Sequence, residues 1–453
     1  MRGLLALVLG LAAGLVLAQP ATHEYRLDNG LKIIVKEDHR APIMVSQVWY
    51  KVGSSYEHDG ITGVSHVLEH MMFKGTKKHP AGEFSKIIAE NGGRENAFTN
   101  QDYTAYFQTM EKSRLPVSME LEADRMRNLT IPDDEVLKEV RVVMEERRMR
   151  TEDNPQSLTY EQFNATAYAS SPYRIPVIGW MDDLENLSVD DLKDWYRMWY
   201  APNNATLVVV GDVDPDEVYA LAKKYFGPLK PSKIAPLKPR KEIQQRGRKD
   251  IKVEAPAKLP YLLMGYKAPV LLTAEQDWEP YALEVLAGVL DGGDSARLAS
   301  ELVRGATLAA SAGAGYSAYD RMQTLFLLSG TPATGHTVAE LEQALLEQVQ
   351  RLRDKPVTKA ELERVKAQIR AQKVYEQDSI FYQAMQMGIL ETVGLSWKDV
   401  DAYLERVEAV TAKQVQEVAR KYLVPERLTV AELVPQPIDP QHPPRSGGGG
   451  HGH

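Results

Sequence analysis

One sequence pattern occurs twice in the chain, 223 residues apart. In each copy a hydroxyl residue that can cap a helix, Ser188 or Thr411, precedes a helical stretch. Each stretch runs to a proline, Pro202 or Pro425, and a β-rich run follows. Because this order recurs at a spacing near half the chain length, we predict two homologous halves.

Each half is predicted to mix strands and helices. Residues 25–35 indicate a hairpin that turns at Asn29-Gly30, and residues 43–52 alternate like a half-buried strand. Helices are predicted over 63–72, 82–91, 113–128 and 132–150. Runs of strands followed by runs of helices favour an α+β fold over a doubly wound parallel sheet.

A proline- and lysine-rich stretch separates the two halves. It has few large apolar residues, so residues 229–247 are predicted to form an extended linker. The N-terminal half then covers 19–228 and the C-terminal half 248–437. The glycine- and histidine-rich tail, 438–453, is expected to be disordered.

The first residues have the features of an export signal. Arg2 precedes an apolar run from Leu4 to Leu17, and Ala18 supplies a small residue at a cleavage site. The run is shorter than the roughly 20 residues of a spanning helix. Residues 1–18 are therefore predicted to be a signal peptide of a periplasmic or extracellular protein. The alternative is an uncleaved anchor with the same domain outside the cytoplasm.

Composition excludes several kinds of chemistry. The chain has no cysteine, so it forms no disulfide, thiolate metal site or cysteine nucleophile. Its net charge of −8 argues against a nucleic-acid binder, which would normally present a basic face. No nucleic-acid partner is expected.

The stretch predicted as helix 63–72 contains the order His-x-x-Glu-His. His66 and His70 are four residues apart, so they project from one helix face, and Glu69 lies on the same side. Two imidazoles and a carboxylate can hold a catalytic zinc ion with a fourth position open for water, whose proton Glu69 could take. The order is the inverse of the common zincin motif. The alternative is a helix with two surface histidines.

A third ligand is available on the helix predicted at 132–150. Glu139 and Glu146 share a stripe with apolar residues, where a carboxylate is costly unless it is paired or binds a metal. Glu145 falls on a polar face beside Lys138. Periodicity therefore favours Glu146 as the ligand and Glu139 as a supporting residue. A simple salt bridge is the alternative for Glu139.

Residues 92–99 predict a tight turn that enters a strand continuing to Phe107. A peptidase needs an open strand edge that pairs with an extended substrate, and Asn96 could hydrogen-bond the substrate backbone. An ordinary hairpin strand is the alternative.

In combination, the motifs of this chain resemble those of the pitrilysin/insulinase (inverzincin) family of zinc peptidases, in the branch of the mitochondrial processing peptidase. The resemblance covers nearly the whole chain after residue 18. The segments that carry it are His66–Thr76, Asn96–Thr99, the pair Glu139 and Glu146, Pro202–Asn204, and Val210–Asp212.

The resemblance implies two similar α+β halves, each a mainly antiparallel sheet flanked by helices. It also implies one zinc ion per chain and peptides or unfolded segments as substrates. The residues it assigns are His66, His70 and Glu146 as zinc ligands, Glu69 as general base, Glu139 as its catalytic support, and Asn96, Ala97 and Arg304 as substrate-binding residues.

One departure from the family pattern concerns the second half. Single-chain active members carry an arginine and, about two turns on, a tyrosine that together stabilise the scissile carbonyl. Here Arg304 is present, but Ala310 replaces the tyrosine, and Tyr316 and Tyr319 are out of register. Losing one such donor typically costs about 10²–10³ in rate. The chain therefore resembles the zinc-bearing partner of a heterodimer whose zinc-less paralogue supplies the pair. A homodimer or a weakly active monomer is the alternative.

The predicted function is a zinc metallo-endopeptidase acting outside the cytoplasm. One alternative is a non-catalytic structural homologue, but such proteins typically lose motif residues. Another is a zinc-binding subunit of a larger complex, in which Glu69 would have no role.

Overall fold

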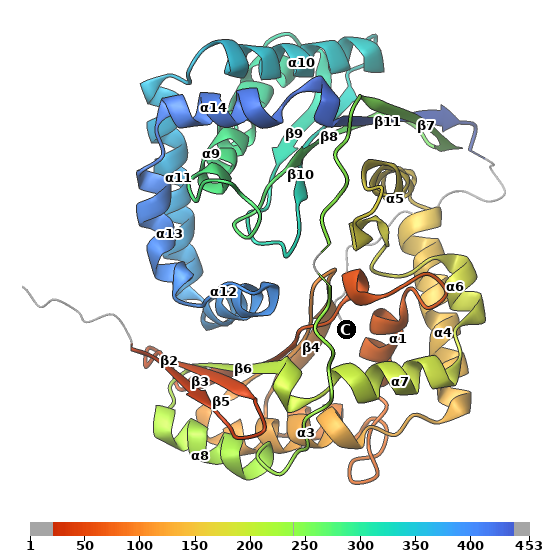
Figure 1. Cartoon of the computed structure of the whole chain (residues 1–453), viewed down its shortest axis with the longest axis vertical. Helices are drawn as coiled ribbons and strands as arrows, with labels where there is room; N and C mark the ends of the chain where they lie inside the picture. Colours follow the sequence, from red (N-terminus) through yellow and green to blue (C-terminus); the bar gives the residue numbers. More distant parts are fainter. Residues whose placement is uncertain (1–20, 239, 439–453) are drawn as a thin grey trace, which may run out of the picture.

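The computed structural model describes residues 21–238 and 240–438 (Figure 1). The predicted signal peptide, 1–18, and nearly all of the predicted tail, 438–453, lie outside the described residues. Among the described residues, no helix combines the length and the apolar character needed to cross a membrane.

The first half contains a six-stranded sheet. Its strands, in spatial order, are β1 (Thr22–Arg26), β2 (Lys32–Glu37), β6 (Ala205–Gly211), β3 (Ile43–Tyr50), β5 (Thr104–Glu111) and β4 (Arg94–Thr99). All neighbours pair antiparallel except β2 and β6, which are parallel. This order leaves β4 at one edge of the sheet.

The second half contains a five-stranded sheet. In spatial order its strands are β7 (Lys249–Pro256), β11 (Leu428–Gln436), β8 (Tyr261–Ala268), β10 (Thr324–Pro332) and β9 (Ala309–Gly315). Only β7 and β11 pair parallel. The order repeats that of β2, β6, β3, β5 and β4, so the predicted α+β fold of two similar, mainly antiparallel halves is confirmed.

Helices flank both sheets (Figure 1). Those of the first half are α1 (Val64–Met71), α2 (Glu83–Glu90), α3 (Leu115–Asn128), α4 (Asp133–Arg147), α5 (Pro155–Ala167), α6 (Met181–Asn186), α7 (Val189–Trp199) and α8 (Pro215–Tyr225). Those of the second half are α9 (Glu279–Asp291), α10 (Val338–Asp354), α11 (Lys359–Asp378), α12 (Ile380–Val393), α13 (Asp399–Glu408) and α14 (Ala412–Tyr422).

The sequence repeat corresponds to the pairs α7–β6 and α14–β11. Ser188 and Thr411 each form a capping box at the start of their helix. Pro202 and Pro425 each begin a short 3₁₀ turn directly before the strand. Both copies therefore fold in the same way.

The two halves exchange a helix. Figure 1 shows α5 beside the second sheet and α12 beside the first. Phe163 of α5 packs with Leu263 and Ala431 of the second sheet. On the other side, Ala384 and Met387 of α12 pack against Trp49 of β3. Each sheet is thus covered on one face by a helix from the opposite half, which ties the halves into one body.

Between α8 and β7 the described residues, with residue 239 left out, form no helix or strand. Glu242 in this segment accepts hydrogen bonds from the backbone N–H groups of Ala169, Ser170 and Ser171, at 2.7–2.9 Å, and pairs with Lys267 of β8. The segment is therefore fixed to both halves. The domain boundaries at 19–228, 229–247 and 248–437 stay predictions.

Candidate metal centre

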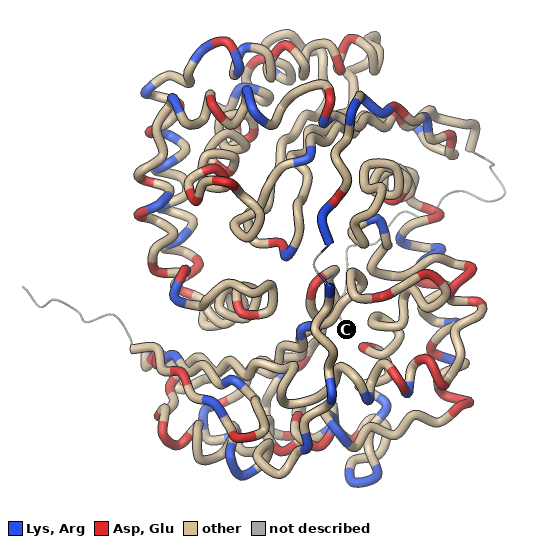
Figure 2. The backbone as a smooth tube through the Cα atoms, in the orientation of Figure 1, with Lys and Arg blue, Asp and Glu red and all other residues tan. Residues whose placement is uncertain are grey.

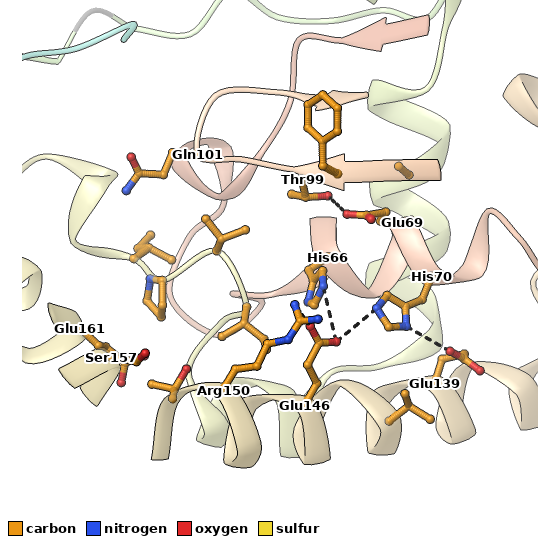
Figure 3. A pocket seen from close by; sticks show the side chains of 18 of the residues that line it. His66, Glu69, His70, Thr99, Gln101, Glu139, Glu146, Arg150, Ser157 and Glu161 are labelled. Carbon is orange, nitrogen blue, oxygen red and sulfur yellow. Dashed lines mark hydrogen bonds and ion pairs between the residues drawn. The ribbon is translucent and has the colours of Figure 1, made fainter. Parts of the chain in front are cut away.

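Helix α1 presents three polar side chains on one side. Its other residues, among them Val67, Leu68 and Met71, are fully buried in the core of the first half. His66, Glu69 and His70 are half-buried and line a cavity (Figure 3). The helical spacing of the apolar residues thus decides which way the three polar side chains face.

The start of α1 is held by a residue that the sequence did not indicate. The buried carboxylate of Glu57 accepts hydrogen bonds from the backbone N–H groups of Gly63 and Ser65, both at 2.8 Å. Burial raises the pKa of Glu57 to about 7, although these hydrogen bonds act in the opposite direction. No local pattern indicates this role, because Glu57 approaches the helix only through the fold of the preceding loop.

Thr62 directly precedes the start of this helix and has a hydroxyl that could cap it, but it does not do so. The N-cap is Gly63, with a φ of 89° that favours glycine, and it has no side-chain cap bond. The Thr62 hydroxyl instead donates to Asp183 and accepts from the backbone N–H of Trp180 at 2.9 Å. Thr62 therefore joins α1 to the start of α6.

Glu146 of α4 lies beside both histidines. Its Oε2 is 3.5 Å from His70 Nε2 and 3.9 Å from His66 Nε2 (Figure 3). One ligand atom from each of the three residues lies within 4.8 Å of the others. The remaining oxygen, Oε1, is 2.6 Å from the guanidinium of Arg150.

The surroundings of Glu146 favour its ionised form. Burial by itself would raise its pKa, but the hydrogen bond with His70 and the charges of His66 and Arg150 outweigh it and hold the pKa at about 2. Glu146 is therefore a carboxylate in this environment, as a metal ligand must be.

Glu139 lies on α4 about two helical turns before Glu146. Its Oε2 is 3.3 Å from His70 Nδ1, the ring nitrogen that faces away from Glu146, and its Oε1 pairs with Lys74. A carboxylate on the second nitrogen of an imidazole fixes the orientation of the ring. Glu145, by contrast, points outward and pairs with Arg148 on the surface.

Glu69 is next to His70 in the chain but stands outside the three-residue group. Its carboxylate accepts a hydrogen bond from the hydroxyl of Thr99, the last residue of β4 (Figure 3). Burial raises the pKa of Glu69, with the Thr99 hydrogen bond acting against it. The carboxylate is thus held on the cavity side of α1 by the edge strand.

The edge strand is shorter than predicted. The strand expected to run from residue 94 to Phe107 is two strands, β4 and β5, joined by a turn at residues 100–103, so that prediction is wrong. Ala97 lines the cavity, as do Phe98 and Thr99. Asn96 is not among the lining residues, and its side-chain oxygen accepts from the Ala97 N–H at 2.8 Å.

The cavity measures about 1050 Å³, and the described residues that line it all lie between His66 and Ile178. Its walls combine the charged group on α1 and α4 with an apolar stretch, Ile175–Ile178, and with Val142 and Tyr160. Arg304 lies in the second half, after a π-helical turn, and donates to the backbone oxygen of Asp294. The structure does not bring it to the cavity.

Arg147 also supports the site, and no sequence pattern indicates its partners. This buried side chain forms two hydrogen bonds with Glu161 of α5, at 2.7 and 2.8 Å, and a third with the backbone oxygen of Gly179 at 2.9 Å. It therefore anchors the end of α4 directly beside Glu146. Sequence periodicity shows that Arg147 faces inward but not which acid it meets.

The donor set fits a catalytic zinc site. Two imidazole nitrogens and one carboxylate oxygen are the three protein ligands of many such sites, with a further position left for water or substrate. Here the group borders a large cavity, so a fourth position is accessible. Away from this group, acidic and basic residues are interspersed along both halves (Figure 2).

This fold and site define a metallopeptidase-like protein, and comparison with known families specifies the class further. Residues 32–179 match "Insulinase (Peptidase family M16)", and residues 186–369 match "Peptidase M16 inactive domain". The chain belongs to peptidase family M16, the insulinase family.

Individual relatives agree with this assignment. The chain is 35% identical to "Zinc protease PqqE" of Helicobacter pylori over 353 residues, which is 77% of this chain and 78% of the relative. It is 32% identical to the mitochondrial-processing peptidase subunit beta of Bos taurus over 216 residues, 48% of this chain and 44% of that one. The crystal structure of a protease from Helicobacter pylori superposes with a TM-score of 0.87 at 32% identity, covering 92% of this chain and all of that chain. The names of these relatives support a peptidase-like function and zinc.

Proposed function

We propose that this protein is a zinc-dependent metallo-endopeptidase that hydrolyses peptides or unfolded segments. The observation that carries the proposal is the group of His66, His70 and Glu146, whose ligand atoms lie within 4.8 Å of one another at the wall of a cavity. Glu69 lies beside the group without belonging to it, as a general base should.

The residues of the chain have separate roles in this proposal. His66, His70 and Glu146 would hold one zinc ion, and Glu139 would orient the ring of His70. When bound, zinc supplies Lewis-acid chemistry that polarises a scissile carbonyl and makes water more acidic. Glu69 takes the proton from the attacking water and passes it to the leaving amine. The Thr99 hydroxyl holds the Glu69 carboxylate in place for both transfers.

The edge strand β4 is the proposed docking strand for substrate. Within the described part of the chain no strand pairs with its outer edge, and Ala97, Phe98 and Thr99 lie along the cavity. An extended peptide can add to such an edge through main-chain hydrogen bonds. Ala97, and Asn96 through its backbone, are the proposed substrate contacts.

We further propose that the active form is a heterodimer with a zinc-less paralogue. Arg304 is not at the cavity of its own chain, and Ala310 has no side-chain donor for a developing oxyanion. A paralogue that carries an arginine and a tyrosine would complete the site. The test is purification of the native protein: a similar-sized partner is expected, and full peptidase rates from the pure single chain would contradict the proposal.

The proposed location is outside the cytoplasm, in the periplasm or the extracellular space. The support is the apolar run Leu4–Leu17 followed by Ala18. Sequencing the N-terminus of the mature protein tests this, with residue 19 expected first. An N-terminus at Met1 on a protein recovered from the cytoplasm would contradict it.

The decisive experiment replaces Glu69 with glutamine in the native protein. The Glu69→Gln variant is expected to keep one zinc ion per chain, because Glu69 is outside the ligand group, and to lose peptidase activity by about 10²–10⁴. Glu90→Gln, at an exposed position of α2, is the matched control and should behave as wild type. If Glu69→Gln cleaves as fast as wild type, the general-base role is wrong. If the wild type binds zinc but cleaves nothing with its partner present, the chain is a zinc-binding subunit instead.

A further inference from the structure

The second half retains a cavity at the place where the first half has its candidate metal centre. Helix α9 follows β8 as α1 follows β3, and residues 282–290 repeat the burial pattern of residues 64–72 position by position. The buried pair Val67-Leu68 recurs there as Val285-Leu286. In this alignment Glu284 takes the position of His66.

The second half has no metal-ligating side chains at two of the three positions that correspond to His66, His70 and Glu146. Gly288 occupies the position of His70, and Gln372 of α11 occupies that of Glu146, counted from the first residue of each helix. Among the described residues, the only group that could hold a metal is the one on α1 and α4. Yet a cavity of about 590 Å³ persists, with Glu284, Gly288 and Gln372 all in its lining.

Glu284 is an incompletely paired carboxylate in this cavity. Tyr403 hydrogen-bonds the carboxylate, but the Oε2 atom is buried and has no hydrogen-bond partner within the described part of the chain. Burial raises the pKa of Glu284 to about 7, against the effects of Tyr403 and Lys373. A buried acceptor of this kind is costly unless a donor reaches it.

The basic side chain whose charge acts on Glu284, that of Lys373, is engaged elsewhere. The ammonium group of Lys373 lies 2.7 Å from Glu376 and 4.5 Å from the ring centroid of Tyr403. It is not part of the cavity lining. A molecule bound in the cavity would supply the donor that Glu284 Oε2 lacks among the described residues.

The other walls specify what kind of molecule fits. Tyr316, Tyr375 and Tyr403 supply aromatic rings, and Val365 and Ile369 supply aliphatic surface. The Tyr316 hydroxyl is already bonded to the backbone oxygen of Pro269, so its ring and not its polar end is left for a ligand. Aromatic rings attract a cation, and a carboxylate attracts both its charge and its N–H donors.

We propose that this cavity binds a small organic cation, namely a guanidinium or primary ammonium group carried on a short aliphatic chain. The charged group would donate to Glu284 Oε2, and the aliphatic chain would lie along Val365 and Ile369. The site does not depend on zinc or on catalysis, because it lies in the other half of the chain from His66, His70 and Glu146.

The test is a binding titration of the full-length, zinc-loaded protein with n-butylguanidine and n-butylamine, followed by NMR or calorimetry. The neutral isostere n-butylurea is the matched ligand control. Saturable binding of at least one cation is expected, and butylurea should bind at least about tenfold more weakly, since a charge-assisted hydrogen bond is lost.

The matched variants locate the site. Glu284→Gln should weaken binding of the cation by at least about tenfold, whereas Glu405→Gln, at an exposed position of α13, should leave it unchanged. Peptidase activity measured in parallel should be the same in both variants. The proposal is overturned if neither cation binds saturably, if butylurea binds equally well, or if Glu284→Gln binds like wild type. Each of these results would mean that water alone fills the cavity or that binding occurs elsewhere.

Discussion

Glu145 and Glu146 are neighbours in the chain but have opposite surroundings. Glu145 pairs with Arg148 on the surface, while Glu146 lies within 3.5 Å of His70 Nε2. Helical periodicity alone separates them, because one position falls in the apolar stripe of α4 and the other does not. This distinction could be predicted from the sequence.

A pair of variants at these positions tests the ligand assignment. Glu146→Gln is expected to weaken zinc binding by more than about 100-fold. Replacing a residue that only hydrogen-bonds a metal ligand already lowers metal affinity by about 10–100-fold, and Glu146 is proposed as a ligand itself. Glu145→Gln, one residue away, should bind zinc as the wild type does. Zinc titration against a competing chelator measures both. Equal affinities in the two variants would remove Glu146 from the proposed site.

Other residues of the site were beyond sequence reasoning. Glu57 caps α1 and Arg147 bridges to Glu161 and Gly179, but each depends on which loop or helix the fold brings next to it. The sequence marks both as charged and says nothing of their partners. Periodicity gives the direction of a side chain, and only tertiary packing gives its neighbour.

At the scale of elements, the exchanged helices α5 and α12 join the halves. Helix α12 lies on the first sheet with Gly388 directly over Trp49. A Cβ atom at Gly388 would lie 2.1 Å from the indole ring, so the helix can approach only because this position has no side chain. A mirrored contact occurs on the second sheet, where a Cβ at Gly265 would lie 2.6 Å from Phe163.

Gly388→Ala should therefore lower the free energy of unfolding, even though alanine favours helices. Overpacking a core typically costs about 1–3 kcal/mol, and here both Trp49 and α12 must move. Gly247→Ala, where an added Cβ meets nothing within 4 Å, is the control and should be nearly neutral. Urea unfolding measures both. A Gly388→Ala protein as stable as wild type would contradict the close packing of α12.

At the scale of the whole molecule, an ion pair between the half-buried Arg321 and the buried Asp102 joins a loop of the second half to the turn beside the candidate site. Arg321 Nε lies 3.2 Å from Asp102 Oδ1, and its guanidinium donates to the Ser55 hydroxyl at 2.7 Å and lies over the Tyr56 ring. Asp102 belongs to the turn between β4 and β5, next to the cavity.

Arg321→Ala would leave the Asp102 carboxylate buried without its cation. The expected loss in the free energy of unfolding is roughly 2–5 kcal/mol, as for other buried charges that lose a partner. Arg370→Ala removes an exposed pair with Glu408 and should cost less than about 1 kcal/mol. Chemical denaturation of the two variants compares these costs. Equal losses would show that the Arg321 pair stabilises the fold no more than an exposed ion pair does.

The linker should make stability depend on pH in the acid range. Burial opposes ionisation of Glu242, but the hydrogen bond with Lys267 and those from the Ala169–Ser171 backbone outweigh it and hold its pKa at about 2, below the usual 4.5. A lowered pKa stabilises the folded state above pH 4.5, and this contribution is lost as pH falls toward 2.

Glu242→Gln should remove this contribution. The variant is expected to be less stable than wild type at pH 6 and to lose less further stability between pH 6 and pH 3. Urea unfolding at the two pH values measures the difference. Glu254→Gln, at an exposed position of β7, serves as control. If the free energy of unfolding falls equally between pH 6 and pH 3 in the wild type and in the Glu242→Gln variant, the contact with Lys267 does not hold Glu242 in its ionised form.

The sequence by itself determined the repeated α+β halves, the helix that carries His66, Glu69 and His70, and the placement of Glu146 rather than Glu145 on the buried face of α4. All of these follow from local spacing, because caps, apolar stripes and turn residues act within a few positions of the chain. The tertiary structure alone decided the exchange of α5 and α12, the buried partners of Glu57, Arg147 and Arg321, and the cavity around Glu284. These depend on contacts between residues far apart in the chain, whose distances no local pattern encodes.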